Sequence, residues 1–170
     1  MSHPSPTTEN ELFVAYLNAQ RRHVLGILEG LDEEALRRPV LPSGWSCLGL
    51  VRHLALDDEC FWFSGTVAGD QSVINDVTEG TNDAWQVGRD VPVEAVFDMY
   101  RKQTEISNAI ITGTSLEAQP AWWPEALFGD WRLDNLREIT LHVLTETAVH
   151  AGHLDAAREL IDGRTWLVLS

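Results

Sequence analysis

The chain has 170 residues, which suit one ordinary domain with a sizeable core, so we expect a single domain over residues 1–170. Its 26 acidic residues outnumber its 12 basic residues, the formal charge is −14, and no basic stripe is present. This balance argues against a nucleic acid or an anionic membrane as partner.

The N-terminal residues and the distribution of apolar residues indicate where the protein is located. Residues 1–8, rich in Ser, Thr and Pro, are expected to form a loose tail, and they lack the basic and apolar regions of a secretory signal. No apolar run is long enough to span a bilayer. We therefore expect a cytoplasmic protein without a membrane partner.

The first half of the chain contains two predicted helices. Apolar residues recur at three- and four-residue spacing over residues 13–31, which predicts an amphipathic helix that ends near Gly30. A short helical turn stopped by Pro39 should follow. Ser46 is then the expected N-cap of a second helix over residues 47–64.

The second helix carries both cysteines and one histidine of interest. Cys47 and Cys60 are separated by several helical turns, which excludes a disulfide between them, and both are expected to be buried small residues. His53 lies at the edge of the apolar stripe of this helix.

The next predicted elements are a long connection and a third helix. Residues 65–90 are polar and glycine-rich without periodicity, which predicts a connection across one end of a bundle. The third helix should begin near Pro92, a residue suited to a first helical turn, and end at Gly113.

The last part of the chain is predicted to be an aromatic-rich loop over residues 116–131 and a fourth helix. Asp134 should open this helix, which continues to about Ile161 and stops at Gly163. Four long helices indicate an all-α four-helix bundle. Periodicity leaves the helix order open, because the connection over residues 65–90 permits a crossover as well as simple up-down order.

The fourth helix places ionisable groups within its apolar face. Projected at about 100° per residue, Glu146 and His150 fall inside one stripe, with His142 one turn earlier and His153 three residues later. A buried carboxylate beside an imidazole is costly unless it is paired, and a metal ion is the simplest partner. The apolar members of the stripe are Leu136, Ile139, Val143, Leu154, Ala157 and Ile161.

A metal centre needs a further ligand from another helix, and His53 is the best candidate. The plain alternative is a core histidine bonded to a neighbouring backbone group or to Asp57 one turn later. Asp57 could itself be a fourth ligand, a general base or, as we prefer, the group that orients His53. His142 or His153 could replace an assigned ligand. Zinc, nickel or ferrous iron accept such a set of one carboxylate and two imidazoles.

Two other residue classes have a functional and a plain interpretation. Arg52 and Arg158 are candidate anchors for an anionic substrate or cofactor, and equally ordinary ion-pair residues. The seven tryptophans are numerous for this length, and some of those in the two long connections could wall a pocket over the metal.

Two motifs resemble the DinB-like superfamily of metal-binding bundles, and in particular its actinobacterial mycothiol-transferase branch, which includes mycothiol-dependent maleylpyruvate isomerases. They are WSCLGLVRHL at residues 45–54, followed by acidic residues and the aromatic run at 61–63, and HVLTETAVHAGHLD at residues 142–155. The resemblance implies a bundle in up-down-down-up order with a long crossover between the second and third helices, and a homodimer. It also implies a metal triad at His53, Glu146 and His150, with glutamate where many relatives carry histidine.

The resemblance implies a thiol S-transferase that depends on a divalent metal, most simply zinc. A low-molecular-weight thiol such as mycothiol would be the co-substrate and a small electrophile the second substrate, with Asp57 receiving a proton. One alternative is a metal-dependent hydrolase or isomerase of a small substrate. Another is a non-enzymatic, stress-linked protein that binds a metal or a small ligand.

Overall fold

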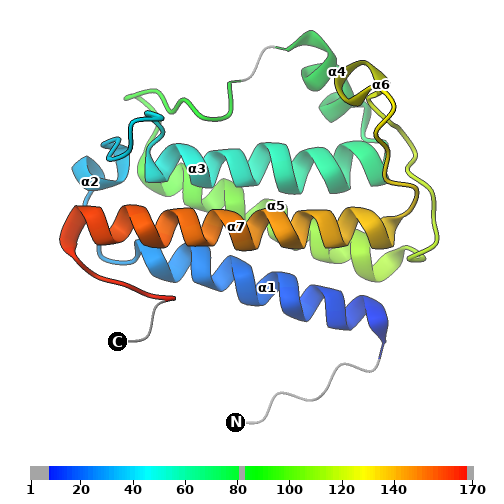
Figure 1. Cartoon of the computed structure of the whole chain (residues 1–170). Coiled ribbons are helices and arrows are strands. Elements are labelled where there is room, and N and C mark those ends of the chain that lie inside the picture. Colours follow the sequence, from blue (N-terminus) through cyan, green and yellow to red (C-terminus); the bar gives the residue numbers. More distant parts are fainter. Residues whose placement is uncertain (1–7, 81–82, 168–170) are drawn as a thin grey trace.

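The computed structural model describes residues 8–80 and 83–167, and within these ranges the chain is helical and contains no β-strand (Figure 1). The predicted all-α class is therefore confirmed. The elements, in chain order, are α1 (Glu9–Leu28), α2 (Glu33–Arg37), α3 (Cys47–His53), the π-helix η1 (Leu54–Val67), α4 (Gln71–Glu79), α5 (Val93–Gly113), α6 (Glu125–Phe128) and α7 (Leu136–Asp162).

Hydrogen bonds to capping side chains determine where α1 and α7, the first and last long helices, begin. Thr8 caps α1 through a reciprocal pair of hydrogen bonds with Glu11, so Thr8 belongs to the helix start and not to the expected tail. The rest of that tail, residues 1–7, lies outside the described residues. Asn135, and not the expected Asp134, caps α7 by accepting a hydrogen bond from the Glu138 backbone. At its other end α7 stops at Gly163, whose φ of +78° is left-handed.

The predicted second helix is continuous, but its hydrogen bonding changes after the seven residues of α3. Ser46 caps α3 as expected. From Leu54 onward the segment is a π-helix that ends at Val67, three residues beyond the predicted end. Because i→i+5 bonds make each turn wider, the residues that share a face of η1 differ from those that an α-helix would align.

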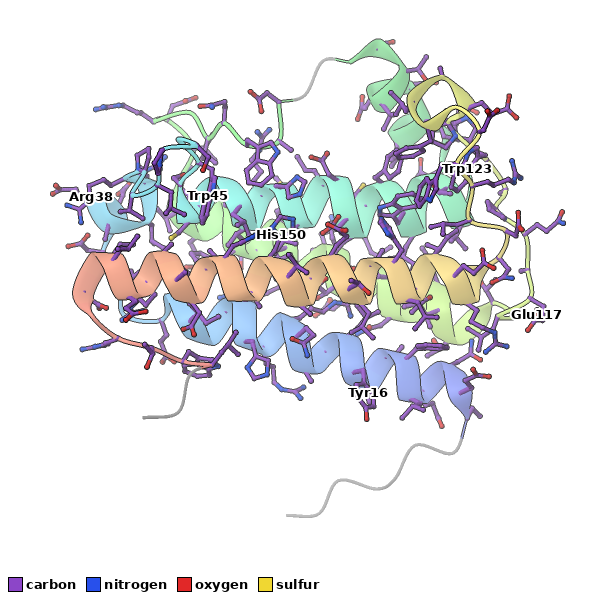
Figure 2. The ribbon with its side chains drawn as sticks, in the orientation of Figure 1. Tyr16, Arg38, Trp45, Glu117, Trp123 and His150 are labelled. Atoms are coloured by element: carbon purple, nitrogen blue, oxygen red, sulfur yellow. The ribbon has the colours of Figure 1, made fainter. Side chains whose placement is uncertain are left out.

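Both long connections contain short helices that the sequence analysis did not predict. Within residues 65–90 the structure has α4, which Asp70 caps and Gly80 ends. Its apolar residues Val73 and Val77 are one turn apart and face η1. A single helical turn, α6, interrupts the aromatic connection, whose side chains gather beside η1 near Trp123 (Figure 2).

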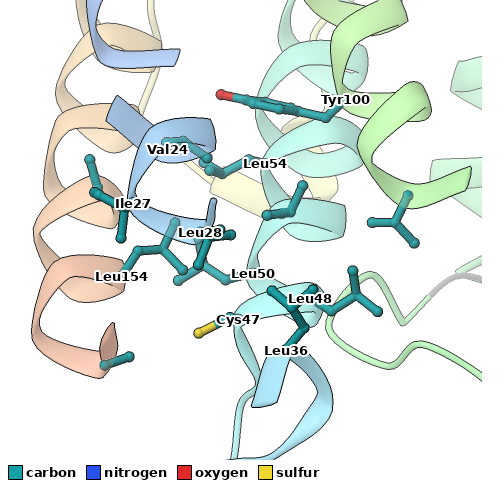
Figure 3. Packing of buried hydrophobic residues seen from close by; sticks show 14 of the residues in the cluster. Val24, Ile27, Leu28, Leu36, Cys47, Leu48, Leu50, Leu54, Tyr100 and Leu154 are labelled. Atoms are coloured by element: carbon teal, nitrogen blue, oxygen red, sulfur yellow. The ribbon is translucent and has the colours of Figure 1, made fainter. Parts of the chain in front are cut away.

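Two apolar clusters form the core, one toward each end of the long helices. In the first cluster Val24, Ile27, Leu50, Leu54 and Leu154 meet between α1, α3 and α7 (Figure 3). The second cluster gathers around η1, α5 and the first half of α7, and its fully buried members include Leu17, Phe63, Ile111, Leu136, Ile139 and Val143.

A polar layer separates the two apolar clusters. Each long helical segment carries, between the two clusters, polar residues that are buried or half-buried: Arg21 on α1, Asp58 and Glu59 on η1, Ser107 on α5, and Thr147 and His150 on α7. The candidate site lies in this layer. Among the described residues, no helix has both the length and the apolar character that a membrane span requires.

Candidate metal centre

Three side chains from the helical segments α3, η1 and α7 converge in the polar layer. His53 at the end of α3, Asp58 on η1 and His150 on α7 each offer one ligand atom, and these atoms lie within 4.8 Å of one another. The two imidazole rings are 5.1 Å apart, centroid to centroid, and nearly perpendicular. Figure 2 shows His150 on the side of α7 that faces α3 and η1.

The π-helix explains the position of Asp58. In an α-helix the residue one turn after His53 is Asp57, whereas the wider turn of η1 brings Asp58, five residues on, to the same side. Asp58 is only 5 % exposed. Its Oδ2 atom has no hydrogen-bond partner among the described residues.

Burying the Asp58 carboxylate without a hydrogen-bond donor for Oδ2 or a positive charge beside it destabilises the folded state. Burial first, and then the charges of Glu146, Glu59 and Asp57, raise the pKa of the Asp58 carboxyl well above its usual value. A buried carboxylate oxygen without a donor is stabilised by a cation, so the site fits a metal ion by this orphaned atom and by its donor set of two imidazoles and a carboxylate.

His150 is held in the neutral form that binds metals. Burial lowers its pKa to about 4, with smaller contributions from His53 and His153. At neutral pH the ring therefore carries no extra proton that a metal would have to displace. His153 is exposed, but its Nδ1 atom lies 3.4 Å from Nδ1 of His150.

His53 is fixed from two sides. Its Nδ1 atom lies 2.7 Å from Oδ2 of Asp57, whose side chain is half exposed. Trp85 stacks on the other side of the imidazole, with ring centroids 4.1 Å apart and planes 18° apart. A carboxylate bonded to one ring nitrogen orients the other nitrogen as a ligand. This contact fits the role that the sequence analysis preferred for Asp57, that of orienting His53.

The loop that carries Trp85 is tied to α3. Arg52 donates from Nη1 to the carbonyl oxygens of Asp83 and Gln86, at 2.7 and 2.6 Å. Gly49 permits the close approach, since a Cβ atom at this position would lie 2.3 Å from the carbonyl oxygen of Trp85. Arg52, a candidate anion anchor, thus holds the aromatic cover of His53.

The structure places the other predicted site residues differently. Glu146 lies beside the three converging groups, with Oε2 3.8 Å from Nε2 of His150, and its side chain is 39 % exposed. Arg158 is buried on the α1 side of α7, where it donates to the carbonyl oxygens of Ile27 and Glu29 and pairs with Asp162. Asp58, which the sequence analysis did not single out, is the carboxylate that meets both histidines.

A cavity of about 520 Å³ opens beside this centre, bounded by α3, η1, α4, α6 and α7. Its volume is in the range of small-molecule sites. Its lining combines aromatic rings, aliphatic side chains and carboxylates. It includes Asp57, Asp58, Phe61, Trp62, Val73, Asp76, Val77, Leu127, Phe128, His142 and Glu146. His142 packs edge-on against Trp62, and burial lowers its pKa.

Comparison with known proteins gives one match. The model of a protein family described as Mycothiol-S-transferase matches residues 12–163, a range that contains every residue of the centre and the cavity. Among curated proteins and among solved structures, no match is found.

Proposed function

The chain belongs to the mycothiol S-transferase family, and from this we propose that it is a metal-dependent enzyme that joins a low-molecular-weight thiol such as mycothiol to a small electrophile. The observation that carries the proposal is the convergence of His53, Asp58 and His150 beside a cavity of small-molecule size. The hydrolase and the non-enzymatic alternatives gain no support from the family match.

We propose His53 and His150 as the nitrogen ligands and Asp58 as the oxygen ligand. Zinc accepts this donor set and keeps a fourth position open; nickel and ferrous iron accept it as well. Glu146, the ligand implied by the resemblance, is the second carboxylate within reach of His150. A divalent ion bound there would lower the pKa of a coordinating thiol and supply a thiolate at neutral pH.

The chain's own groups perform the remaining tasks. Asp57 holds the His53 ring through Nδ1, and because its half-exposed carboxylate lines the cavity, it is also our candidate acceptor for the thiol proton. Phe61, Trp62 and Phe128 provide apolar walls that exclude water from the reacting atoms. The role of Arg158 in binding a cofactor stays a prediction from the sequence, because this side chain does not line the cavity and donates to the carbonyl oxygen of Ile27 instead.

We also propose an order and a direction for the four long helical segments. The colour gradient in Figure 1 runs the same way along α1 and α7, and the opposite way along α3–η1 and α5. This supports a four-helix bundle in up-down-down-up order, with the segment that contains α4 as the crossover. The homodimer and the cytoplasmic location stay predictions.

The test combines metal content with thiol-dependent turnover. We expect the purified protein to bind about one divalent ion per chain and to accelerate the reaction of mycothiol with 1-chloro-2,4-dinitrobenzene. Asp58→Asn and His150→Gln should each weaken metal binding by at least about tenfold, as expected for the loss of a ligand, and abolish turnover. Glu146→Gln should have the smaller effect on metal binding.

His153→Gln is the matched control, because it removes an exposed imidazole next to His150 and should leave one ion bound. Metal uptake that survives both Asp58→Asn and His150→Gln would refute the ligand assignment. Metal-loaded protein that never consumes thiol with an electrophile would refute the transferase.

A further inference from the structure

The charges around the cavity are all of one sign. Asp57, Asp58, Asp76 and Glu146 line it, and none of the lining residues within the described ranges is a lysine or an arginine. These four carboxylates outnumber the two charges of a divalent ion, so the negative sign would persist with a metal in place. A cleft lined by one sign of charge repels ligands of that sign.

The two arginines that the sequence offered as anion anchors do not correct this imbalance. Arg52 is engaged by the carbonyl oxygens of the Trp85 loop. Arg158 is buried between α1 and α7 and pairs with Asp162. Neither side chain lines the cavity.

The walls away from the metal ligands are apolar and aromatic. Val73 and Val77 come from α4, and Leu127 and Phe128 come from α6. Phe128 stacks on Trp62 with ring centroids 5.6 Å apart and planes 12° apart. Aliphatic and aromatic walls bind apolar groups, and aromatic faces also attract cations.

Resting on the proposed transferase function, we infer that the electrophile of this site is an apolar molecule without negative charge, and that the cavity accepts a cationic substituent at least as well as a neutral one. Asp76 determines part of this specificity, because it adds a carboxylate to the lining from α4, a helix that carries none of the proposed metal ligands.

A series of benzyl chlorides tests the inference. The para substituent is isopropyl, carboxylate or trimethylammoniomethyl. Isopropyl and carboxylate have the same number of non-hydrogen atoms, so this pair differs mainly in charge, and the bulkier cation tests the opposite sign. In each reaction the thiolate sulfur attacks the benzylic carbon, the carbon–sulfur bond forms as the carbon–chlorine bond breaks, and chloride leaves with the bonding electrons. The thiol proton passes to a carboxylate or to solvent. Each kcat/KM is divided by the rate constant of the uncatalysed reaction with the same thiol.

We expect the neutral compound to exceed the carboxylate by at least tenfold, and the cationic compound to equal or exceed the neutral one. A carboxylate compound that reacts as well as the neutral one would overturn the inference. If none of the three is turned over above the uncatalysed rate, the transferase proposal fails instead.

Unreactive analogues keep the charge inference testable in that case. Toluenes with the same three para substituents bind without reacting, and their affinities are measured by the change in tryptophan fluorescence of the wall. The same order of charge preference should appear. Equal affinities for the carboxylate and the neutral analogue would refute the inference whatever the activity.

Two variants on α4 distinguish the effect of the charge inside the cavity from the effect of the net charge of the protein. Asp76→Asn should narrow the ratio between neutral and carboxylate compounds by about two- to fivefold, as expected for an exposed charge that solvent screens. Glu79→Gln makes a similar charge change on the same helix, but Glu79 does not line the cavity, so the ratio should stay unchanged. Equal effects of both variants would assign the discrimination to net charge alone.

Discussion

At the scale of single residues, the polar layer shows three ways of keeping an ionisable group out of water. Glu59 is 1 % exposed and receives two hydrogen bonds from the Arg21 guanidinium. His150 loses its proton, because burial lowers its pKa to about 4. Asp58 has no basic side chain paired with it, and its Oδ2 atom has no hydrogen-bond partner among the described residues, which is why we assign a metal ion to it.

The pKa of His150 predicts how the metal-free protein responds to acid. In the unfolded chain a histidine has a pKa of about 6.5, so as the pH falls the unfolded state takes up the proton first. The free energy of unfolding should therefore decrease between about pH 6.5 and pH 4, by about 2 kcal/mol from pH 7 to pH 5. His150→Gln should lack this loss.

Urea unfolding with a chelator present measures the loss at the two pH values. The charged and titratable groups around the ring are His53, Asp58, Glu146 and His153. The raised pKa of Asp58 works in the opposite direction, since it favours the folded state as the pH falls, and this contribution is present in both proteins. Equal pH dependence in His150→Gln and in the unchanged protein would contradict the prediction.

At the scale of elements, the π-helix η1 is the feature that builds the site, and a buried ion pair holds it. Nε and Nη2 of Arg21 donate to the two carboxylate oxygens of Glu59 at 2.7 and 2.6 Å. Nη1 of Arg21 donates to Asn18 on the same helix and to Asn108 on α5. This network ties η1 to α1 and α5 at the turn that carries Asp58.

Replacing only Arg21 should lower the free energy of unfolding far more than replacing both members of the pair with apolar residues. Arg21→Met leaves the Glu59 carboxylate buried without its partner, and we expect the free energy of unfolding to fall by about 3–5 kcal/mol. The double variant with Glu59→Met should recover most of that loss, because no charge is then left buried. Urea denaturation of the two variants gives the comparison. A double variant no more stable than Arg21→Met would show that the pair contributes more than mutual neutralisation.

The sequence predicted the long helices and the short helix α2 before Pro39, but it did not predict α4 and α6, for a physical reason. Periodicity needs several turns to emerge, and α1, α5 and α7 provide them, whereas α4 has nine residues and α6 four. The Asp70 cap and the Val73–Val77 pair were the signals of α4. The π-helix had no local signal beyond three consecutive acidic residues, 57–59, inside an apolar run.

At the scale of the whole molecule, the net charge of −14 acts against the compact state. Like charges repel more strongly when the chain is folded, and salt screens that repulsion. Raising sodium chloride from about 20 mM to about 300 mM should therefore increase the melting temperature of the metal-free protein by a few degrees. Differential scanning calorimetry measures the shift.

Potassium chloride should give the same shift at the same ionic strength, because screening depends on ionic strength. A melting temperature that falls or stays constant would mean that local ion pairs, such as Arg137 with Glu9 and Glu117, outweigh the general repulsion.

The sequence alone determined the all-α class, the family and the two histidines that converge in the polar layer, because helical periodicity and the two motifs are local properties of the chain. The expectation that Glu146 completes a triad with them stays a prediction. Only the tertiary structure showed that Asp58 meets both histidines, that Trp85 covers His53, and that both candidate arginines are engaged elsewhere. These facts depend on the rotational phase of each helix against its neighbours, and one wide helical turn changes that phase by a whole residue.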